Sequence, residues 1–314
     1  MIDYTSRVFV AGHTGLVGQA FVRRLKKDGY INLILRGHSE LDLTNQQDVI
    51  HFFSQEKPDI VIICAGKVGG IYANFTFPAE FIYDNLQIQT NLIHQSYLGG
   101  VKKLVYFCST CAYPKYADQP MVEKSLLTGS LEPTNEPYAV AKIAGLKMCQ
   151  SYNCQYGTHY LTIVPTNLYG PYDNFDTQNG HVIPGMIRRL HHAKENHLPE
   201  VSVWGSGTPK REFLFVDDLV DACLFILQNN YFENQPVNVG SQQEISIKEL
   251  ASLISQTVGY FGKLSFDTSK PDGMPLKKVD TSKLDNLGWR ASTNLASGLG
   301  LTYEWFLNNR GVLL

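Results

Sequence analysis

The sequence predicts an α/β fold built on a doubly wound parallel sheet, followed by a smaller α/β domain. Short apolar runs alternate with segments of helical periodicity from residue 7 to residue 164. A glycine-rich turn, residues 12–18, separates the first run from the first helical segment. After Pro171, His, Asn, Arg and Pro become frequent and strand signals become rare. The first two observations predict the sheet, and the third predicts a second domain.

The bulk composition is typical of a globular chain with roughly two domains. Of its 314 residues, 44% are hydrophobic and 18% are charged, and the net charge is -2. We therefore expect neither nucleic acid nor a membrane surface as a partner. No apolar run reaches the ~18 residues of a membrane span, and the first residues are too polar for a signal peptide. The six cysteines are expected to stay reduced, which predicts a cytoplasmic location.

The first strand and helix enclose a dinucleotide-binding turn. Residues 7–11 are apolar and β-branched, residues 19–29 have helical periodicity, and residues 32–35 form the next apolar run. A glycine turn between a strand and a helix is the phosphate-binding element of Rossmann-type sheets. The sequence therefore predicts a Rossmann-type domain at the start of the chain.

The glycines of this turn are spaced as Gly12-x-x-Gly15-x-x-Gly18. The first two allow a tight turn and close approach to a pyrophosphate, and the third lets the helix pack on the strand. The helix N-terminus then faces the phosphate charge. This spacing resembles the extended branch of the short-chain dehydrogenase/reductase superfamily. The expected cofactor contacts are Gly12, Thr14, Gly15, Leu16, Val17 and Gly18.

The end of the second strand indicates which dinucleotide is bound. An acid there would accept the ribose hydroxyls of NAD and repel the 2′-phosphate of NADP. This chain has Arg36 and His38 instead, and no acid before Glu40. Cationic side chains favour NADP(H). By resemblance to the superfamily, Asp42 and Leu43 are expected to lie against the adenine.

The alternation of strands and helices then continues. Strands are predicted at residues 59–65, 104–108 and 160–164, and helices at residues 46–55, 79–98 and 133–156. In a doubly wound sheet, ligands bind at the carboxyl ends of the strands. We therefore expect one crevice to be surrounded by the residues that follow successive strands: Gly12, Arg36, Ala65, Ser109 and Asn167.

Ser109, Tyr138 and Lys142 are candidate catalytic residues. Tyr138 and Lys142 are four residues apart on a predicted helix, so their side chains share one face. An ammonium beside a phenol favours the phenolate, which makes Tyr138 a candidate proton donor and acceptor near neutral pH. Ser109 could hold the substrate oxygen that receives the proton. The alternative is an ordinary amphipathic helix, since roughly one Tyr-x-x-x-Lys pattern is expected by chance.

The second half of the chain has fewer sequence patterns that predict helices or strands. We predict a helix beginning at 213–218 and running to about 227, a strand at 237–240, a helix at 246–257, a turn at 270–273 and a helix around 301–307. Asp217 and Asp218 give the first of these helices an acidic first turn. Ser246 and Glu249 have the spacing of a capping box.

Seven segments in order along the chain resemble the GDP-L-fucose synthase family, whose members are bifunctional GDP-4-keto-6-deoxy-D-mannose 3,5-epimerase/4-reductases. They are residues 11–13, 67–70, 132–139, 165–171, 181–184, 204–209 and 211–213. The similarity runs from about residue 7 to the C-terminal helix. We expect an NADP-binding domain and a GDP-sugar-binding domain, formed respectively by residues 1–170 with about 213–240, and by about 171–212 with 241–314.

The resemblance implies roles that a simple ketone reductase would not need. Cys111 matches the family's base and His181 its acid, for inversion at C3 and C5 of the sugar. Ser109 and Tyr138 are expected to hold the C4 oxygen, and Tyr138 to protonate it after hydride transfer. Lys142 is expected to lower the pKa of Tyr138 and to bind the nicotinamide ribose. Taken alone, Cys111 would be a small core residue and His181 a structural histidine.

The resemblance also assigns the two ligands. Relatives often carry Arg at the positions of Thr14 and His38, so Arg36 is the main candidate for the 2′-phosphate; we expect NADPH first, with NADH use open. Lys277 and Lys278 could add charge near the GDP. Further cofactor contacts are expected from Pro165, Asn167, Leu168 and His181. The expected GDP contacts are Arg189, Trp204, Arg211 and Asp272.

Several alternatives stay open. A relative acting on another GDP-4-keto sugar, a deoxy or heptose analogue, would use the same residues. An NAD-dependent 4-epimerase or 4,6-dehydratase is disfavoured, because Cys111 stands where a dehydratase has an acid pair. A non-catalytic NADP sensor would tend to lose Tyr138 or Lys142. Cys108-x-x-Cys111 has no second pair, so no metal is expected. The family further implies a homodimer through paired long helices.

Overall fold

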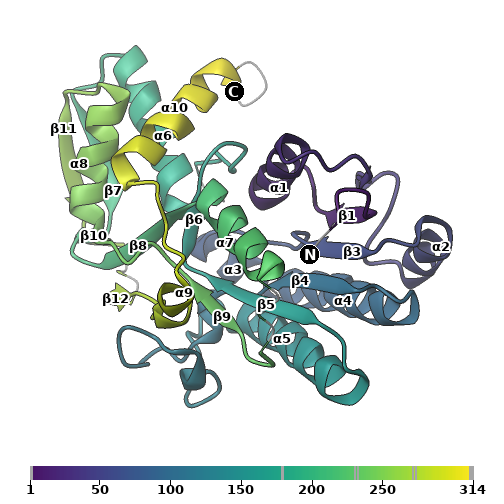
Figure 1. The fold of residues 1–314 in the computed structure, drawn as a ribbon. Coiled ribbons are helices and arrows are strands. Elements are labelled where there is room, and N and C mark those ends of the chain that lie inside the picture. Colours follow the sequence, from purple (N-terminus) through teal and green to yellow (C-terminus); the bar gives the residue numbers. More distant parts are fainter. Residues whose placement is uncertain are drawn as a thin grey trace.

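The computed structural model describes residues 3–177, 180–229, 231, 233–270, 272 and 274–310. Its largest sheet has six strands in the order β2-β1-β3-β4-β5-β9, and all neighbours are parallel. The strands are β1 (Val8–Ala11), β2 (Leu33–Ile34), β3 (Ile60–Ile63), β4 (Lys103–Phe107), β5 (Tyr160–Pro165) and β9 (Val237–Val239). The predicted doubly wound parallel sheet is confirmed, and strand order reverses beside β1 (Figure 1).

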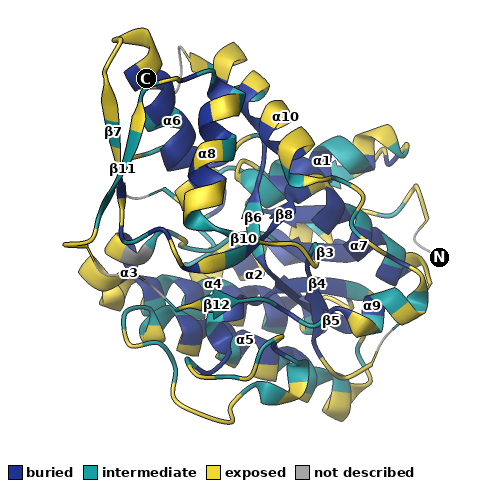
Figure 2. Ribbon diagram, turned by 90° about the vertical axis from the view of Figure 1, so that its left-hand side faces the viewer, coloured by how far each residue is buried: buried dark blue, intermediate teal, exposed yellow. Residues whose placement is uncertain are grey.

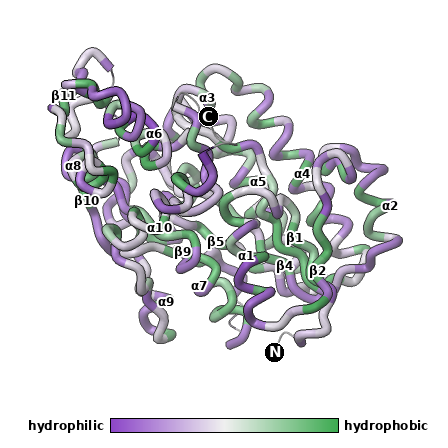
Figure 3. Tube along the Cα trace, turned by 90° about the horizontal axis from the view of Figure 1, so that it is seen from above, coloured by the Kyte–Doolittle hydropathy of each residue, from purple (hydrophilic) through white to green (hydrophobic). Residues whose placement is uncertain are grey.

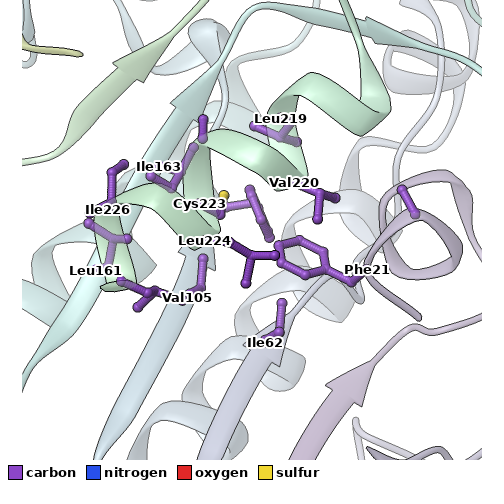
Figure 4. Close-up of a cluster of buried hydrophobic side chains, with 14 of the residues drawn as sticks. Phe21, Ile62, Val105, Leu161, Ile163, Leu219, Val220, Cys223, Leu224 and Ile226 are labelled. Carbon is purple, nitrogen blue, oxygen red and sulfur yellow. The ribbon is translucent and has the colours of Figure 1, made fainter. Parts of the chain in front are cut away.

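Helices cover both faces of this sheet. On one face lie α1 (Leu16–Lys27) and α7 (Val216–Gln228); on the other lie α2 (Gln46–Glu56), α4 (Pro78–Leu98) and α5 (Glu136–Tyr156). Alternate strand residues enter the two cores: Val8 and Val10 face α1 and α7, and Phe9 faces α2. Figure 4 shows Phe21 of α1 packed among residues of the strands and α7. Burial on both faces explains why these strands are mostly apolar.

A second group of strands lies beside the large sheet. Strands β6 (Asn167–Tyr169) and β12 (Leu276–Lys277) pair parallel with β8 (Lys210–Phe215), and β10 (Glu244–Ser246) pairs antiparallel with it. Separately, β7 (Glu200–Trp204) pairs with β11 (Lys263–Asp267). A third core lies among these strands and the helices α6 (Val182–Glu195), α8 (Ile247–Val258) and α10 (Leu295–Asn308). Figure 1 shows this part next to the carboxyl ends of β4 and β5.

Several predicted elements need correction. Residues 213–215 were expected to begin a helix, but they end β8, and α7 begins at Val216. Residues 171–212, with few strand signals, contain α6, β7 and the first half of β8. The helix predicted from residue 19 already begins at Leu16. The capping box at Ser246 is confirmed. Pro271 and Gly273 of the predicted turn lie outside the described residues.

The remaining elements were not predicted. They are α3 (Ile71–Thr76), α9 (Ser282–Leu287) and two 3-10 helices, Thr110–Ala112 and Glu123–Ser125, together with β6, β7, β10, β11 and β12. Figure 2 shows that β7 and β11 are much more exposed than β4 and β5. Short, half-exposed strands bury few side chains and therefore leave little periodic signal.

The apolar residues concentrate in the central strands. Figure 3 shows hydrophobic segments along β1 and β4 and a more hydrophilic outer surface on the helices. Among the described residues, no helix combines the length and the hydropathy that crossing a bilayer would require.

Candidate active site

The chain turns sharply at the carboxyl end of β4. Ser109 caps the 3-10 helix Thr110–Ala112, and its Oγ accepts a hydrogen bond from the Cys111 backbone N–H at 3.2 Å. The cap satisfies a donor that the short helix leaves free. Ser109 and Cys111 are thereby held together at the edge of the sheet where ligands bind.

Helix α5 brings Tyr138 and Lys142 to the same place. The Lys142 Nζ is buried and donates to the carbonyl oxygen of Phe107 at 3.0 Å, at the end of β4. The Lys142 Nζ lies 5.8 Å from the centre of the Tyr138 ring. The Ser109 hydroxyl is close enough to Tyr138 to lower the pKa of its phenol. The structure therefore brings Ser109, Cys111, Tyr138 and Lys142 into one cluster.

Burial dominates the protonation of this cluster. It raises the pKa of Tyr138, an effect that Cys111 and Cys108 increase and the hydrogen bond with Ser109 partly offsets. Burial also lowers the pKa of Lys142 to about 8. Desolvation thus favours the protonated phenol of Tyr138 in this structure. The expectation that Lys142 lowers the pKa of Tyr138 stays a prediction.

Two neighbours of Cys111 come from other elements. The Asn135 Nδ2, at the N-terminus of α5, lies 3.3 Å from the Cys111 Sγ, and the Lys277 Nζ of β12 lies 3.6 Å from it. Sequence reasoning gave Asn135 no role and considered Lys277 only for the GDP. Asn135 stands three residues before Tyr138 in the 132–139 segment, and that proximity was the only available signal.

His181 lies in the second part of the chain, and its printed side-chain contact is with Asp173. It is the N-terminal cap residue of α6, and its side chain is 45% exposed. Its Nδ1 lies 3.8 Å from Oδ1 of Asp173, whose side chain is only 4% exposed. Burial by the surrounding protein lowers the pKa of His181, but the hydrogen bond and charge of Asp173 outweigh this and raise it. No sequence signal had identified Asp173.

The glycine turn after β1 fits a dinucleotide pyrophosphate. Gly12 has a φ of +78°, and a Cβ on it would lie 2.7 Å from backbone atoms of Ala65. A Cβ on Gly18 would lie 2.1 Å from the Gly12 carbonyl oxygen. Gly15 caps α1 without a side-chain hydrogen bond, and the buried Nδ1 of His13 has no partner. The turn thus combines a free helix N-terminus with an unsatisfied polar atom.

Of the residues expected to bind the adenosine half of the cofactor, Arg36 and Asp42 already make contacts within the protein. Arg36 forms an ion pair with Glu56, and its Nη1 donates to the Leu35 carbonyl oxygen at 3.0 Å. His38 is exposed. The hydrogen bonds of Thr44 lower the pKa of Asp42. Leu43 packs partly buried against the core, while Thr14, Leu16 and Val17 surround the start of α1.

Glu212 of β8 links the segment between β5 and β6 to the segments around Gln242 and Val279. Its carboxylate is fully buried and accepts backbone N–H donors from Gln242 at 2.6 Å and Val279 at 3.0 Å. Its carbonyl oxygen accepts from Thr166 Oγ1 at 3.0 Å and from Asn167 Nδ2 at 2.9 Å. Pro165 and Leu168 flank these two residues, at the end of β5 and in β6.

The expected GDP-binding residues lie on the second group of strands and helices. The Nη1 of Arg211 donates to the carbonyl oxygens of Lys210 and Met274 at 2.7 and 2.6 Å. The Arg189 Nη1 donates to the carbonyl oxygen of Ser202 at 3.5 Å. Burial lowers the pKa of both arginines.

The other two GDP-binding candidates lie on neighbouring surface segments. The Trp204 ring is 56% exposed, with the Lys270 Nζ 5.7 Å from its centre. Asp272 accepts hydrogen bonds from the backbone N–H and the Oγ of Ser206 at 2.9 and 2.7 Å. The Asp272 carboxylate thus fixes the loop after Trp204 and leaves the indole face available for stacking.

Cys108 and Cys111 differ in burial. Cys108 is buried, and burial raises its pKa to about 12, whereas Cys111 is only partly buried. Within the described ranges, no group of three or more His, Cys, Asp or Glu side chains is arranged to hold a metal ion.

The chain is similar to known proteins over most of its length. Residues 8–240 match a family model described as NAD dependent epimerase/dehydratase family. GDP-L-fucose synthase 1 of Arabidopsis thaliana is 57% identical over 309 residues, covering 98% of this chain and 95% of that protein.

Two solved structures share the fold over nearly the full length. A GDP-L-fucose synthetase from Naegleria fowleri bound to NADP has a TM-score of 0.91 and 29% identity, covering 99% of this chain and 97% of that one. A GDP-6-OMe-4-keto-L-xylo-heptose reductase from C. jejuni has a TM-score of 0.92 and 38% identity, covering 98% and 99%.

Proposed function

The chain belongs to the NAD dependent epimerase/dehydratase family and, within it, to the GDP-L-fucose synthases, and we propose that the cluster around Cys111 is its active site. The reaction is the NADPH-dependent 3,5-epimerisation and 4-reduction of GDP-4-keto-6-deoxy-D-mannose to GDP-L-fucose. The observation that supports this site best is the convergence of Ser109, Cys111, Tyr138 and Lys142 at the carboxyl end of β4.

Epimerisation requires a base and an acid on opposite faces of the sugar. The C4 ketone acidifies the protons on C3 and C5, and hydrogen-bond donors on the C4 oxygen stabilise the resulting enolate. Cys111 removes each proton, and His181 returns one to the opposite face. Ser109 and Tyr138 hold the C4 oxygen, since the two hydroxyls lie on neighbouring side chains of the same cluster.

Reduction uses the same oxygen-binding pair. Bound NADPH supplies a hydride to C4, and Tyr138 donates a proton to the C4 oxygen. Tyr138 has a proton to donate, because burial raises its pKa and keeps the phenol protonated. Lys142, anchored on the Phe107 carbonyl, orients the nicotinamide ribose.

Each ligand has its own side of the crevice. The glycine turn, Ala65, Asn167 and their neighbours bind NADP, so residues 1–170 with about 213–240 form the cofactor domain. Arg189 and Arg211 bind the GDP diphosphate, Trp204 stacks on the guanine and Asp272 holds their loop. These residues lie in the sugar-nucleotide domain, about 171–212 and 241–314.

A related GDP-4-keto sugar is the second candidate substrate. The C. jejuni heptose reductase covers nearly the whole chain, so the fold accommodates a larger sugar. The 57% identity to a fucose synthase, against 38% to the heptose reductase, favours the 6-deoxyhexose.

Direct assay distinguishes these candidates. We expect purified protein, given GDP-4-keto-6-deoxy-D-mannose and NADPH, to form GDP-L-fucose, identified by NMR of the sugar product. The same incubation with a GDP-4-keto-heptose should turn over more slowly. The opposite order of kcat/KM would assign the heptose, and no turnover of either would refute the proposed function.

We also propose a cytoplasmic homodimer. All six cysteines are free, as expected in a reducing compartment. Helices α4 and α5 pack together and expose Leu98 and Tyr156, apolar surface that a second copy would cover. Light scattering should give twice the monomer mass, and Leu98→Glu with Tyr156→Glu should give the monomer. A monomeric wild type would contradict the dimer and leave the reaction unaffected.

A further inference from the structure

The loop between β6 and α6 contains a buried carboxylate without a full set of partners. Asp173 Oδ1 accepts a hydrogen bond from the Asn174 backbone N–H at 2.8 Å, but Oδ2 is buried and has no hydrogen-bond partner. A buried, charged oxygen is costly unless a donor or a cation compensates for it. The charged or titratable group beside this carboxylate is the imidazole of His181, whose Nδ1 lies 3.8 Å from Oδ1.

The backbone brings these two residues together across the loop. The Gly180 N–H donates to the Asp176 carbonyl oxygen at 3.0 Å, closing a turn just before His181. A Cβ on Gly180 would lie 2.4 Å from the carbonyl oxygens of Asn174 and Asp176. The turn therefore needs glycine, and this close packing returns the chain to Asp173.

We propose that Asp173 is the positioning residue that turns the Nδ1–H of His181 inward, leaving Nε2 as the proton donor to the sugar. The inference rests on the proposed function, in which His181 is the acid. In each inversion the Nε2–H bond breaks and a C–H bond forms at C3 or C5. Nε2 then regains its proton from water, to which the 45% exposed ring has access. Nδ1 keeps its proton throughout, because the buried carboxylate holds it.

Among the charged groups in this region, Asp173 is the one that affects the protonation of His181. Arg188 of α6 donates to the Phe175 carbonyl oxygen at 3.5 Å, and Arg23 of α1, paired with Asp217, lies over the Tyr172 ring. The electrostatic influence on His181 comes from Asp173, which favours the protonated ring against its partial desolvation.

The test uses deuterium exchange, which isolates proton transfer from reduction. Enzyme loaded with NADP⁺ is incubated in D₂O with GDP-4-keto-6-deoxy-D-mannose, and exchange at C3 and C5 is followed by NMR across pH. Asp173→Asn should slow exchange by about 10²-fold. The exchange rate falls as pH rises through the pKa of His181, so losing Asp173 should move this fall to lower pH. NADPH oxidation, which depends on Tyr138, should change by about threefold or less.

Two controls separate the possible failures. Glu195→Gln removes the carboxylate beside His191, a His–acid pair at 3.1 Å on the same helix, and should leave exchange unchanged. His181→Asn should slow exchange at least as much as Asp173→Asn. If His181→Asn is slow while Asp173→Asn matches wild type in rate and pH profile, the role of Asp173 is refuted. If wild type neither exchanges nor reduces the substrate, the proposed function itself has failed.

A spectroscopic measurement on the wild type covers the case in which Asp173→Asn does not fold. The ¹⁵N shifts of His181, identified by their loss in His181→Asn, should show the Nδ1–H tautomer above the pKa of the ring. An Nε2–H tautomer would place the proton on the wrong nitrogen and overturn the proposal.

Discussion

Cys111 lies where three separate parts of the chain meet. Ser109 holds its backbone from the end of β4, Asn135 contacts its sulfur from α5, and Lys277 does so from β12. Ser109 and Cys111 could be recognised from the sequence, but Asn135 and Lys277 could not be connected to them, because the contact depends on how distant elements pack. Asp173 was missed for the same reason, since an aspartate in a loop has no periodic signal.

The role of Cys111 predicts a separable defect. Cys111→Ser replaces a thiol by a far less acidic hydroxyl of nearly the same shape. We expect deuterium exchange at C3 and C5 to be lost, while some reduction of the 4-ketone persists. NMR of the sugar measures the first and NADPH oxidation the second. Unchanged exchange would assign the base to another residue; Cys154→Ser, an exposed cysteine on α5, is the matched control.

Lys142 should make stability depend on pH in a way that a neutral residue does not. Its pKa is about 8 when folded and ~10.4 when unfolded, so between these values the unfolded chain binds more protons and stability rises with pH. Lys142→Met removes this dependence. Its stability relative to wild type should therefore fall by about 3 kcal/mol from pH 8 to 10.5, as measured by urea unfolding. A difference that is constant over this range would contradict the buried, partly neutral lysine.

At the level of elements, the sequence correctly predicted the strands that are buried on both faces of the sheet. Strands β1 and β3 are buried along their whole length and were found, as was the capped helix α8. Strand β7 buries only Val203 completely, so its pattern resembles a loop. The boundary of α7 was misplaced because the apolar residues before Val216 continue a strand rather than a helix.

Helix α10 offers a matched pair of glycine substitutions. A Cβ on Gly298 would lie 2.1 Å from the hydroxyl of the buried Tyr169, whereas one on Gly300, two residues later, meets nothing within 4 Å. Gly298→Ala should destabilise the protein by about 1–3 kcal/mol, and Gly300→Ala should stabilise it by about 0.4–1 kcal/mol. Thermal unfolding of the two variants measures this. Equal effects would show that α10 does not pack against Tyr169 as described.

At the scale of the whole molecule, Glu212 links the start of β6 to the segments that follow β9 and β12. It is fully buried, and the segments that it links are far apart in sequence. Glu212→Gln replaces one acceptor oxygen by an NH₂ that faces backbone donors. We expect a loss of about 1.5–3 kcal/mol in the free energy of unfolding. Glu195→Gln, which breaks a surface pair with Arg310, should cost about 0–1 kcal/mol, and a similar loss in both variants would deny Glu212 its linking role.

The Glu212 junction also bears on how related enzymes come to accept different sugars. The carbonyl of this residue fixes Asn167 on the coenzyme side, while its carboxylate fixes the strand region that carries Lys277 on the sugar side. Under the proposed function, the distance between the hydride donor and the ketone carbon then stays the same in related enzymes whose loops around the sugar differ. New substituents on the hexose can be accommodated at the periphery without re-optimising the distance over which the hydride travels.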